Sequence, residues 1–234
     1  MRRCWSVLFI FGFAAIGGCN TPTTPDQRTT LNQGGSYEGR QLVLAVLRGN
    51  TAKVRELVES GIPIDAAEQI TGRTPLHWAA MAGQEEIAIY LIDQGAPLEA
   101  RDELNQTPLF DAVVGGKDRI VARLLARGAR TDVKDKYGQP ILVAAANPNN
   151  EGKSTFEILL THGLDVNQSG GLPHNATALH WVAYYGMIEE VRYLLTNGAD
   201  VHALDSEGMT PRDWAEGRNR HEVVETLTRA MDAR

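Results

Sequence analysis

The chain has 234 residues, of which 43% are hydrophobic and 22% are charged, and this composition excludes an intrinsically disordered or fibrous protein. Lysine and arginine number 23 against 29 aspartate and glutamate residues, so the formal charge of -6 disfavours nucleic-acid binding as the main activity. The two cysteines, Cys4 and Cys19, leave the rest of the chain without a disulfide, a zinc-type cysteine cluster or a thiol nucleophile.

Residues 1–18 are predicted to be a signal peptide. A basic start at Arg2 and Arg3 precedes an apolar block from Trp5 to Gly18, which is the order found in secretory signals. The block has 14 residues, whereas a membrane-spanning helix needs about 20. We therefore do not expect this block to persist as a transmembrane anchor.

The end of this block, Ile16-Gly17-Gly18-Cys19, resembles the lipobox of bacterial lipoproteins. The resemblance implies that Cys19 becomes the mature N-terminus and carries diacylglycerol and an acyl chain such as palmitate, which together attach a protein stably to a membrane. Asn20 stands where aspartate favours inner-membrane retention in enterobacteria. The implied location is the bacterial cell envelope, on the periplasmic side of the outer membrane. The alternative is an ordinary cleaved signal with a chance cysteine.

Residues 19–36 are predicted to be the lipidated cysteine and a flexible tether. From Thr21 to Ser36 the chain is rich in Thr, Pro, Gln and Gly and has almost no large apolar side chain, so it cannot bury enough surface to order itself. Such a segment has a root-mean-square reach of roughly 20–25 Å, enough to hold a folded body away from lipid headgroups.

A repeat of about 33 residues organises residues 37–231. Its clearest motif is Thr-Pro-Leu-His-Trp-Ala-Ala, and the repeated units begin near residues 37, 71, 104, 137, 174 and 207. Copies of the motif begin at Thr74, Thr107, Thr177 and Thr210, with weaker copies at Leu42 and Pro140.

Each unit is predicted to be a pair of helices. Thr74 is the expected N-cap and Pro75 the first helical residue, while Gly83 and Gly95 are expected to end the two helices. One pair of this size cannot bury its apolar face alone, so neighbouring pairs must stack. The pattern resembles the ankyrin repeat. That resemblance implies an all-α repeat solenoid of about six units, with β-hairpins projecting beside a concave groove.

The histidines offer little support for catalysis. His77 and His180 lie three units apart, too far to share one ion, and the ankyrin resemblance implies that each hydrogen-bonds its motif threonine and the adjacent hairpin. The sequence also contains no nucleophile elbow, metalloprotease helix or phosphate-binding glycine loop, so we predict no enzyme activity, cofactor or metal. The rival interpretation is a hydrolase or metal-dependent enzyme, which contacts among His174, His180 and His202 would favour.

The resemblance directs two positions of each first helix toward the groove, and aromatic residues there are typical of binding hot spots. The predicted partner-binding residues are Leu44, Leu47, Trp78, Met81, Asp111, Val114, Trp181 and Tyr184, and the equivalent positions also hold Ala144, Asn147 and Trp214. The alternative for the tryptophans is a scaffold role. Charges at the hairpin tips are expected to steer the partner; they are Arg101, Asp102, Glu103, Lys134, Asp135, Lys136, Asp205 and Glu207.

Unit four departs from the repeat. Pro140 replaces the threonine cap, a loss of roughly 1 kcal/mol, and the hairpin from Gln168 to Asn175 is about two residues longer. We expect this unit to be the least stable and its hairpin to be a contact loop. In the last unit, Arg212 and Glu216 replace apolar residues, which suits a terminal capping repeat.

The leading functional prediction is a monomeric, lipid-anchored protein that binds a partner protein of unknown identity without catalysis. Its membrane contact would be the lipid anchor alone. Two more specific roles stay open, namely an immunity or inhibitor protein that blocks an envelope toxin or enzyme, and a stress-protection scaffold.

Overall fold

The computed structural model of the protein describes residues 37–148 and 154–233. The predicted signal peptide, Cys19 and the tether lie outside these residues. Within them the chain forms twelve helices in six pairs. The first helices of the pairs are α1 (Tyr37–Leu47), α3 (Pro75–Ala82), α5 (Pro108–Val114), α7 (Ile141–Ala145), α9 (Ala178–Tyr185) and α11 (Pro211–Glu216). The second helices are α2 (Thr51–Glu59), α4 (Glu85–Asp93), α6 (Asp118–Ala126), α8 (Ser154–Thr161), α10 (Ile188–Thr196) and α12 (His221–Asp232).

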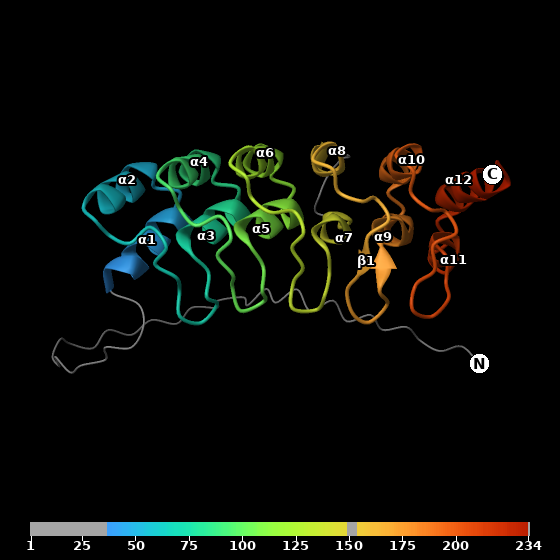
Figure 1. The fold of residues 1–234 in the computed structure, drawn as a ribbon, viewed down its shortest axis with the longest axis horizontal. Helices are drawn as coiled ribbons and strands as arrows, with labels where there is room; N and C mark the ends of the chain where they lie inside the picture. The colour runs from blue at the N-terminus through green and yellow to red at the C-terminus, as the bar shows by residue number, and fades with distance from the viewer. Residues whose placement is uncertain (1–36, 149–153, 234) are drawn as a thin grey trace. The chain divides into compact units, whose positions relative to one another are not determined.

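The pairs stack in chain order. First helices form one layer and second helices another, and the loops that join successive pairs extend beyond the first-helix layer (Figure 1). Each first helix packs against the first helix of the next pair and against the second helix of its own pair. The predicted all-α repeat fold is therefore confirmed.

The helix boundaries follow from capping chemistry. Thr74 has extended backbone geometry and a capping box with His77, and Pro75 is the first residue of α3. Gly83 ends that helix with a φ of 68°, a left-handed conformation that glycine adopts without a steric penalty.

The motif histidines connect neighbouring repeats. His77 is fully buried; its Nδ1 lies 2.8 Å from Thr74 Oγ1 and its Nε2 lies 3.1 Å from the backbone oxygen of Gln106 in the next hairpin. His180 makes the same pair of contacts, with Thr177 and with the backbone oxygen of Met209. The hydrogen-bonding role that we predicted for these histidines is confirmed.

One apolar core runs through all the pairs. Its described members extend from Leu42 to Leu227, and the motif leucines Leu76 and Leu109 are fully buried. Each pair is amphipathic and covers its apolar side only against a neighbour, so burial accumulates along the row. No helix within the described ranges is both long enough and apolar enough to cross a membrane.

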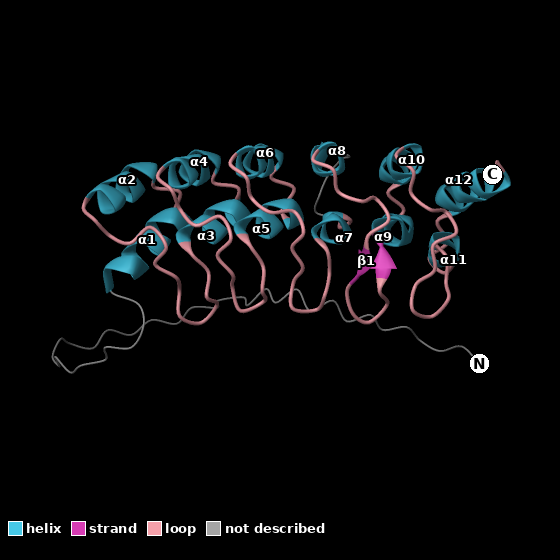
Figure 2. Cartoon of the chain, viewed as in Figure 1, coloured by secondary structure: helices cyan, strands magenta, loops and turns pink. Residues whose placement is uncertain are grey.

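Unit four has the shortest first helix of the six described pairs. Helix α7 has five residues, and its N-cap residue Pro140 makes no side-chain capping bond. Its hairpin contains the strand pair shown in Figure 2, β1 (Ser169–Gly170) and β2 (Ala176–Thr177), which is antiparallel. Gly170 is required there, because a Cβ at this position would clash with the backbone oxygen of Gly138.

Candidate partner-binding surface

The partly exposed side chains of the first helices form the surface predicted to bind a partner, which we call the inner-helix surface. Its predicted members differ in accessibility. Leu47 is 45% exposed and Met81 is 37% exposed, whereas Asp111 is only 5% exposed. The remaining predicted members are half-buried, namely Leu44, Trp78, Val114, Trp181 and Tyr184.

An aromatic cluster occupies this surface in the last two repeats. It consists of Trp181, Tyr184 and Tyr185 on α9 and Trp214 on α11. The ring centroids of Trp181 and Trp214 are 5.0 Å apart in an edge-to-face arrangement, and Tyr184 lies 5.9 Å from Trp214. All four residues are half-buried, so part of the cluster remains accessible to a partner. The structure thus brings together the predicted contact residues Trp181 and Tyr184.

Trp214 anchors the aromatic cluster to the scaffold. Its Nε1 donates a hydrogen bond of 2.9 Å to Asp205 Oδ2, and its ring centroid lies 5.4 Å from that of His180 in an edge-to-face arrangement. The other oxygen of Asp205 accepts hydrogen bonds from the backbone of Glu207 and Met209. Trp214 therefore has a scaffold role and also holds Trp181 and Tyr184 of α9 in place.

Two arginines border the aromatic cluster. The guanidinium of Arg218 lies 4.2 Å from the ring centroid of Tyr184, within the range of a cation–π interaction. The Nε of Arg220 donates to the backbone oxygen of Tyr184 at 3.2 Å. A partner group that docks on Tyr184 would therefore also meet positive charge.

A half-buried arginine, Arg73, organises the inner-helix surface between units two and three. Arg73 Nε donates to Asp102 Oδ2 at 3.0 Å and Arg73 Nη2 to Asp111 Oδ1 at 3.1 Å. The same guanidinium contacts the sulfur of Met81 and lies 5.4 Å from the ring centroid of Trp78. The sequence analysis did not identify Arg73 as a functional residue. The feature that could have indicated it is a cation directly before the motif, where the next two units have glutamine.

Asp111 is a buried support of this surface and not an exposed contact, which corrects the sequence-based prediction. Burial raises the pKa of its carboxyl group to about 7, and Arg73, which by itself lowers this pKa, offsets the effect only in part. The nearby Asp102 carboxylate raises the pKa of Asp111 further. Asp111 therefore titrates close to neutral pH.

The hairpin aspartates also differ from the sequence-based prediction. Asp102, Asp135 and Asp205 are 7–8% exposed, and an oxygen of each accepts hydrogen bonds from two backbone N–H groups of its own turn. These carboxylates stabilise the turns because the side chain of aspartate can bond the backbone two and four residues ahead. The exposed charges at the tips are therefore Arg101, Glu103, Lys134, Lys136 and Glu207.

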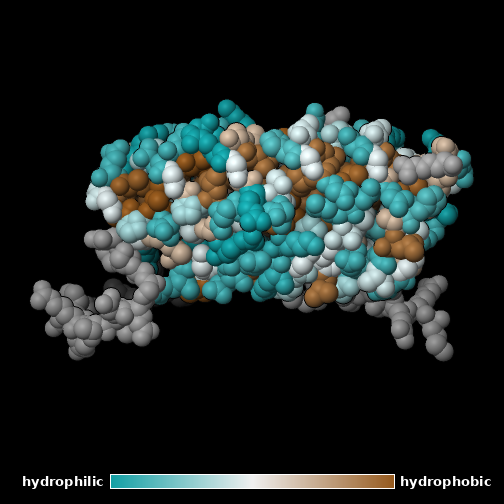
Figure 3. Space-filling model, in the orientation of Figure 1, coloured by the Kyte–Doolittle hydropathy of each residue, from teal (hydrophilic) through white to brown (hydrophobic). Residues whose placement is uncertain are grey.

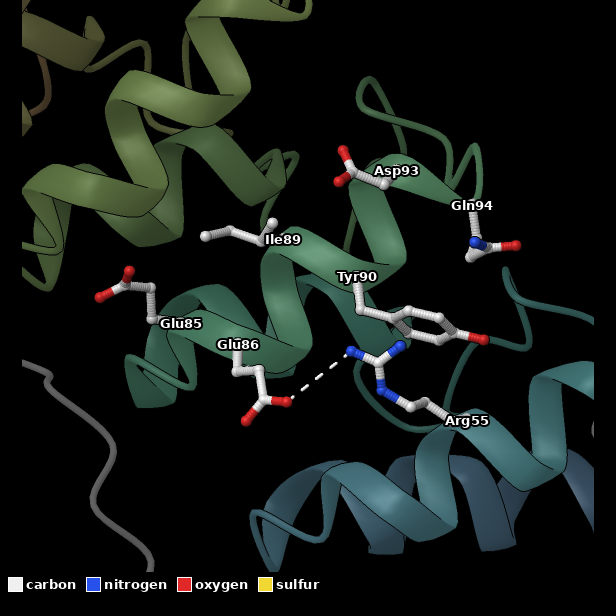
Figure 4. A pocket seen from close by; sticks show the side chains of 7 residues that line it. All are labelled: Arg55, Glu85, Glu86, Ile89, Tyr90, Asp93 and Gln94. Carbon is white, nitrogen blue, oxygen red and sulfur yellow. Dashed lines mark ion pairs between the residues drawn. The ribbon is translucent and has the colours of Figure 1, made fainter.

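A shallow hollow of about 570 Å³ lies between the second helices α2 and α4, away from the first-helix layer (Figure 4). Its central residue is Arg55, whose guanidinium is 3.7 Å from Glu86 and 4.4 Å from the ring centroid of Tyr90. These groups are paired with each other, and none is a nucleophile beside a base. Within the described residues, no group of three or more His, Cys, Asp or Glu side chains could hold a metal ion.

The repeat geometry agrees with the comparison with known families. The family described as "Ankyrin repeats (3 copies)" matches residues 42–135 and 141–233. The chain belongs to the ankyrin-repeat family. Ankyrin repeats are protein–protein interaction modules, so partner binding is the function consistent with this fold.

Solved ankyrin structures share the architecture. The ankyrin repeat domain of human ASB11 aligns with a TM-score of 0.73 and 25% identity, covering 81% of this chain and 82% of that one. The ankyrin repeat domain of Bcl-3, a member of the IkappaB protein family, aligns with a TM-score of 0.70 and 26% identity, covering 81% and 85%.

Curated relatives are much longer proteins. The palmitoyltransferase AKR1 of Saccharomyces cerevisiae is 38% identical over 78% of this chain, but the match covers 24% of that protein. The potassium channel AKT1 of Arabidopsis thaliana is 39% identical over 80% of this chain and 21% of the channel. The similarity to both proteins is thus confined to a quarter or less of their length.

Proposed function

We propose that this protein is a lipid-anchored component of a bacterial cell envelope that binds a partner protein through its inner-helix surface and hairpin tips, without a catalytic step. The aromatic cluster on α9 and α11 carries the proposal. Its side chains are half-buried and lie edge to face across two repeats, and tryptophan and tyrosine supply much of the binding energy at protein interfaces.

The rigidity of the aromatic cluster favours tight binding. The hydrogen bond from Trp214 to Asp205 and the contact of Trp214 with Trp181 fix these side chains before a partner arrives. Pre-organised side chains lose less conformational entropy on binding, so more of the contact energy appears as affinity.

The anchor and the lack of catalysis rest on different observations. The lipobox-like segment that ends at Cys19 supports lipid attachment. His77 and His180, the most buried histidines, are engaged in helix capping and inter-repeat hydrogen bonds, which leaves them no role as acid or base.

The test is a double variant, Trp181→Ala with Tyr184→Ala. The lipid-free body, residues 20–234, would capture its partner from envelope extract, and the dissociation constant of the identified complex would then be measured. We expect the double variant to weaken binding by more than about 30-fold, which corresponds to roughly 2 kcal/mol.

The matched control is Tyr193→Ala, an aromatic change on α10 of the same repeat but in the second-helix layer. It should leave the dissociation constant unchanged. Circular dichroism should show the same helical content in all three proteins. Unchanged affinity in the folded double variant would contradict binding at the aromatic cluster.

A further inference from the structure

Three exposed cations lie together on the tips of two successive hairpins. They are Arg101, on the hairpin between α4 and α5, and Lys134 and Lys136, on the hairpin between α6 and α7. Arg101 Nη1 donates to the backbone oxygens of Asn105 at 2.7 Å and Lys134 at 3.4 Å, so its guanidinium bridges the two tips. Within the described residues, no ion pair joins any of the three cations to a carboxylate.

The neighbouring carboxylates Asp102 and Asp135 already have hydrogen-bond or ion-pair partners within the protein. Asp102 is paired with Arg73 and accepts two backbone hydrogen bonds, and Asp135 accepts hydrogen bonds from Tyr137 and Gln139 at 2.9 Å. Glu103 is exposed at the tips, and Glu99 and Asp132 are exposed further back on the same two hairpins. Glu99 accepts a hydrogen bond from the backbone N–H of Arg130, and Asp132 is paired with the Arg130 side chain. At the tips themselves, Arg101, Lys134 and Lys136 therefore outnumber Glu103, although the whole chain has a formal charge of -6.

Apolar side chains adjoin the cations. Tyr137 is 50% exposed and Leu172, on the longer hairpin of the following unit, is 76% exposed. The backbone N–H of Leu172 donates to the backbone oxygen of Tyr137 at 3.2 Å, so these residues are neighbours on successive hairpins. Lys136 Nζ lies 5.2 Å from the ring centroid of Tyr137. Exposed apolar residues bordered by charge are typical of a protein-interaction site.

The longer hairpin is held firmly on both sides. Gly171 donates to the backbone oxygen of Gly138 at 3.2 Å, and Ser206 donates to the backbone oxygen of His174 at 2.7 Å. Hydrogen bonds to the preceding and the following hairpin therefore position Leu172.

Figure 3 shows hydrophilic residues over much of the lower half of the visible face, which is the side of the hairpins.

We propose that these tips, defined by Arg101, Lys134, Lys136, Tyr137 and Leu172, bind an acidic segment of a partner protein that also carries apolar side chains. This inference rests on the proposed function and adds the charge of the partner and the place where it docks. The cations and apolar residues follow one another along successive hairpins, an arrangement suited to an extended peptide. Opposite charges would speed association and select the partner.

An anionic membrane is the competing class of ligand, and the size of the cluster argues against it. Sequence clusters that bind anionic lipids usually contain about 4–8 lysines or arginines. The hairpin tips present three. The acidic protein segment is therefore favoured, and lipid binding becomes an outcome of the test.

The experiment selects ligands from a random-peptide library on the immobilised body, residues 20–234, which retains every described core residue. We expect the enriched peptides to be rich in Asp and Glu and to contain apolar residues. The charge-reversing variant Lys134→Glu with Lys136→Glu should lose this enrichment and bind a selected acidic peptide at least about tenfold more weakly. Raising the salt concentration should weaken wild-type binding.

The matched control is Arg119→Glu with Arg229→Glu, which changes the net charge equally at exposed positions on α6 and α12. It should bind the acidic peptide as the wild type does. Enriched peptides without an acidic excess, or equal weakening in the control, would overturn the inference. Cosedimentation with phosphatidylglycerol-rich vesicles that is lost in the lysine variant would also overturn it, by assigning the tips to lipid.

The same proteins separate this inference from the proposed function. If partner capture depends on Trp181 and Tyr184 while the lysine variant binds normally, the inner-helix surface stands and the hairpin-tip proposal fails. If acidic peptides depend on the lysines while the aromatic variant captures the partner unchanged, the tips stand and binding at the aromatic cluster fails.

Discussion

Individual buried residues give this protein opposing responses to pH. Burial lowers the pKa of His77 and His180, so both favour the neutral form, and the stability that they confer falls as the pH drops below about 6.5, where the unfolded chain takes up protons more readily. Asp111 acts in the other direction. Its pKa is raised from 3.8 to about 7, so its contribution is complete below pH 3.8 and is lost as the pH rises to about 7.

Asp111→Asn should therefore remove the loss of folding stability that ionisation of the buried Asp111 carboxyl causes as the pH rises. Between pH 5 and pH 7 we expect the free energy of unfolding of the variant to improve relative to wild type by about 2–3 kcal/mol, because asparagine cannot ionise. Urea unfolding at a series of pH values would measure this difference. Asp132→Asn, a change at a surface carboxylate paired with Arg130, is the control and should follow the wild-type profile. Parallel curves for wild type and Asp111→Asn would contradict the assignment.

At the level of elements, the caps determine which helices depend on their neighbours. Helices α3, α9 and α11 begin with capping boxes, and in the last of these Asp213 takes the place of the motif histidine. Helix α7 has no side-chain cap and five residues, yet all five side chains are buried. Packing against α5 and α9 therefore maintains α7, and local capping does not.

We expect this difference to appear in hydrogen exchange. The backbone amides of α7 should exchange roughly fivefold faster than those of α5, because a missing cap costs about 1 kcal/mol. Exchange followed by mass spectrometry of peptides that separate the two helices would measure the ratio. The capped helix α9 provides a second reference. Equal protection of α5, α7 and α9 would show that packing fully compensates for the missing cap.

At the scale of the whole molecule, the proposed lipid anchor and the repeat row have separate physical bases. The row is stabilised by burial between neighbouring pairs, from Leu42 to Leu227 within the described residues. Membrane attachment would depend on acyl chains at Cys19, because the preceding apolar block is too short to span a bilayer.

This separation predicts that Cys19→Ser abolishes lipid attachment. Cells grown with a clickable palmitate analogue should label the wild-type protein and leave Cys19→Ser unlabelled. Cys4→Ser is the matched control, because that cysteine lies within the predicted signal peptide and should be removed with it. The lipoprotein proposal fails if Cys19→Ser is labelled as strongly as wild type.

The sequence alone was sufficient to predict the repeat fold and its family. Thr74, Pro75, Gly83 and their equivalents act over a few residues, so a motif repeated every 33 residues is enough to predict the helix pairs and their stacking. The same regularity placed Trp181 and Tyr184 at the helix positions that Trp78 and Met81 occupy three units earlier. It also showed that Pro140 stands where the clear copies of the motif have a threonine cap.

Only the tertiary structure decided which charges are accessible. Arg73 meets Asp102 and Asp111, which lie 29 and 38 residues away, and this pairing buries a carboxylate that the repeat pattern placed among the exposed contacts. The side chains of Asp102 and Asp135 are likewise buried and hydrogen-bonded to the backbone of their own turns, so the exposed charges at the tips are mainly those of lysine and arginine. The physical reason is that a charged side chain is exposed or buried according to the partners that adjacent repeats supply, and those partners are far away in the sequence.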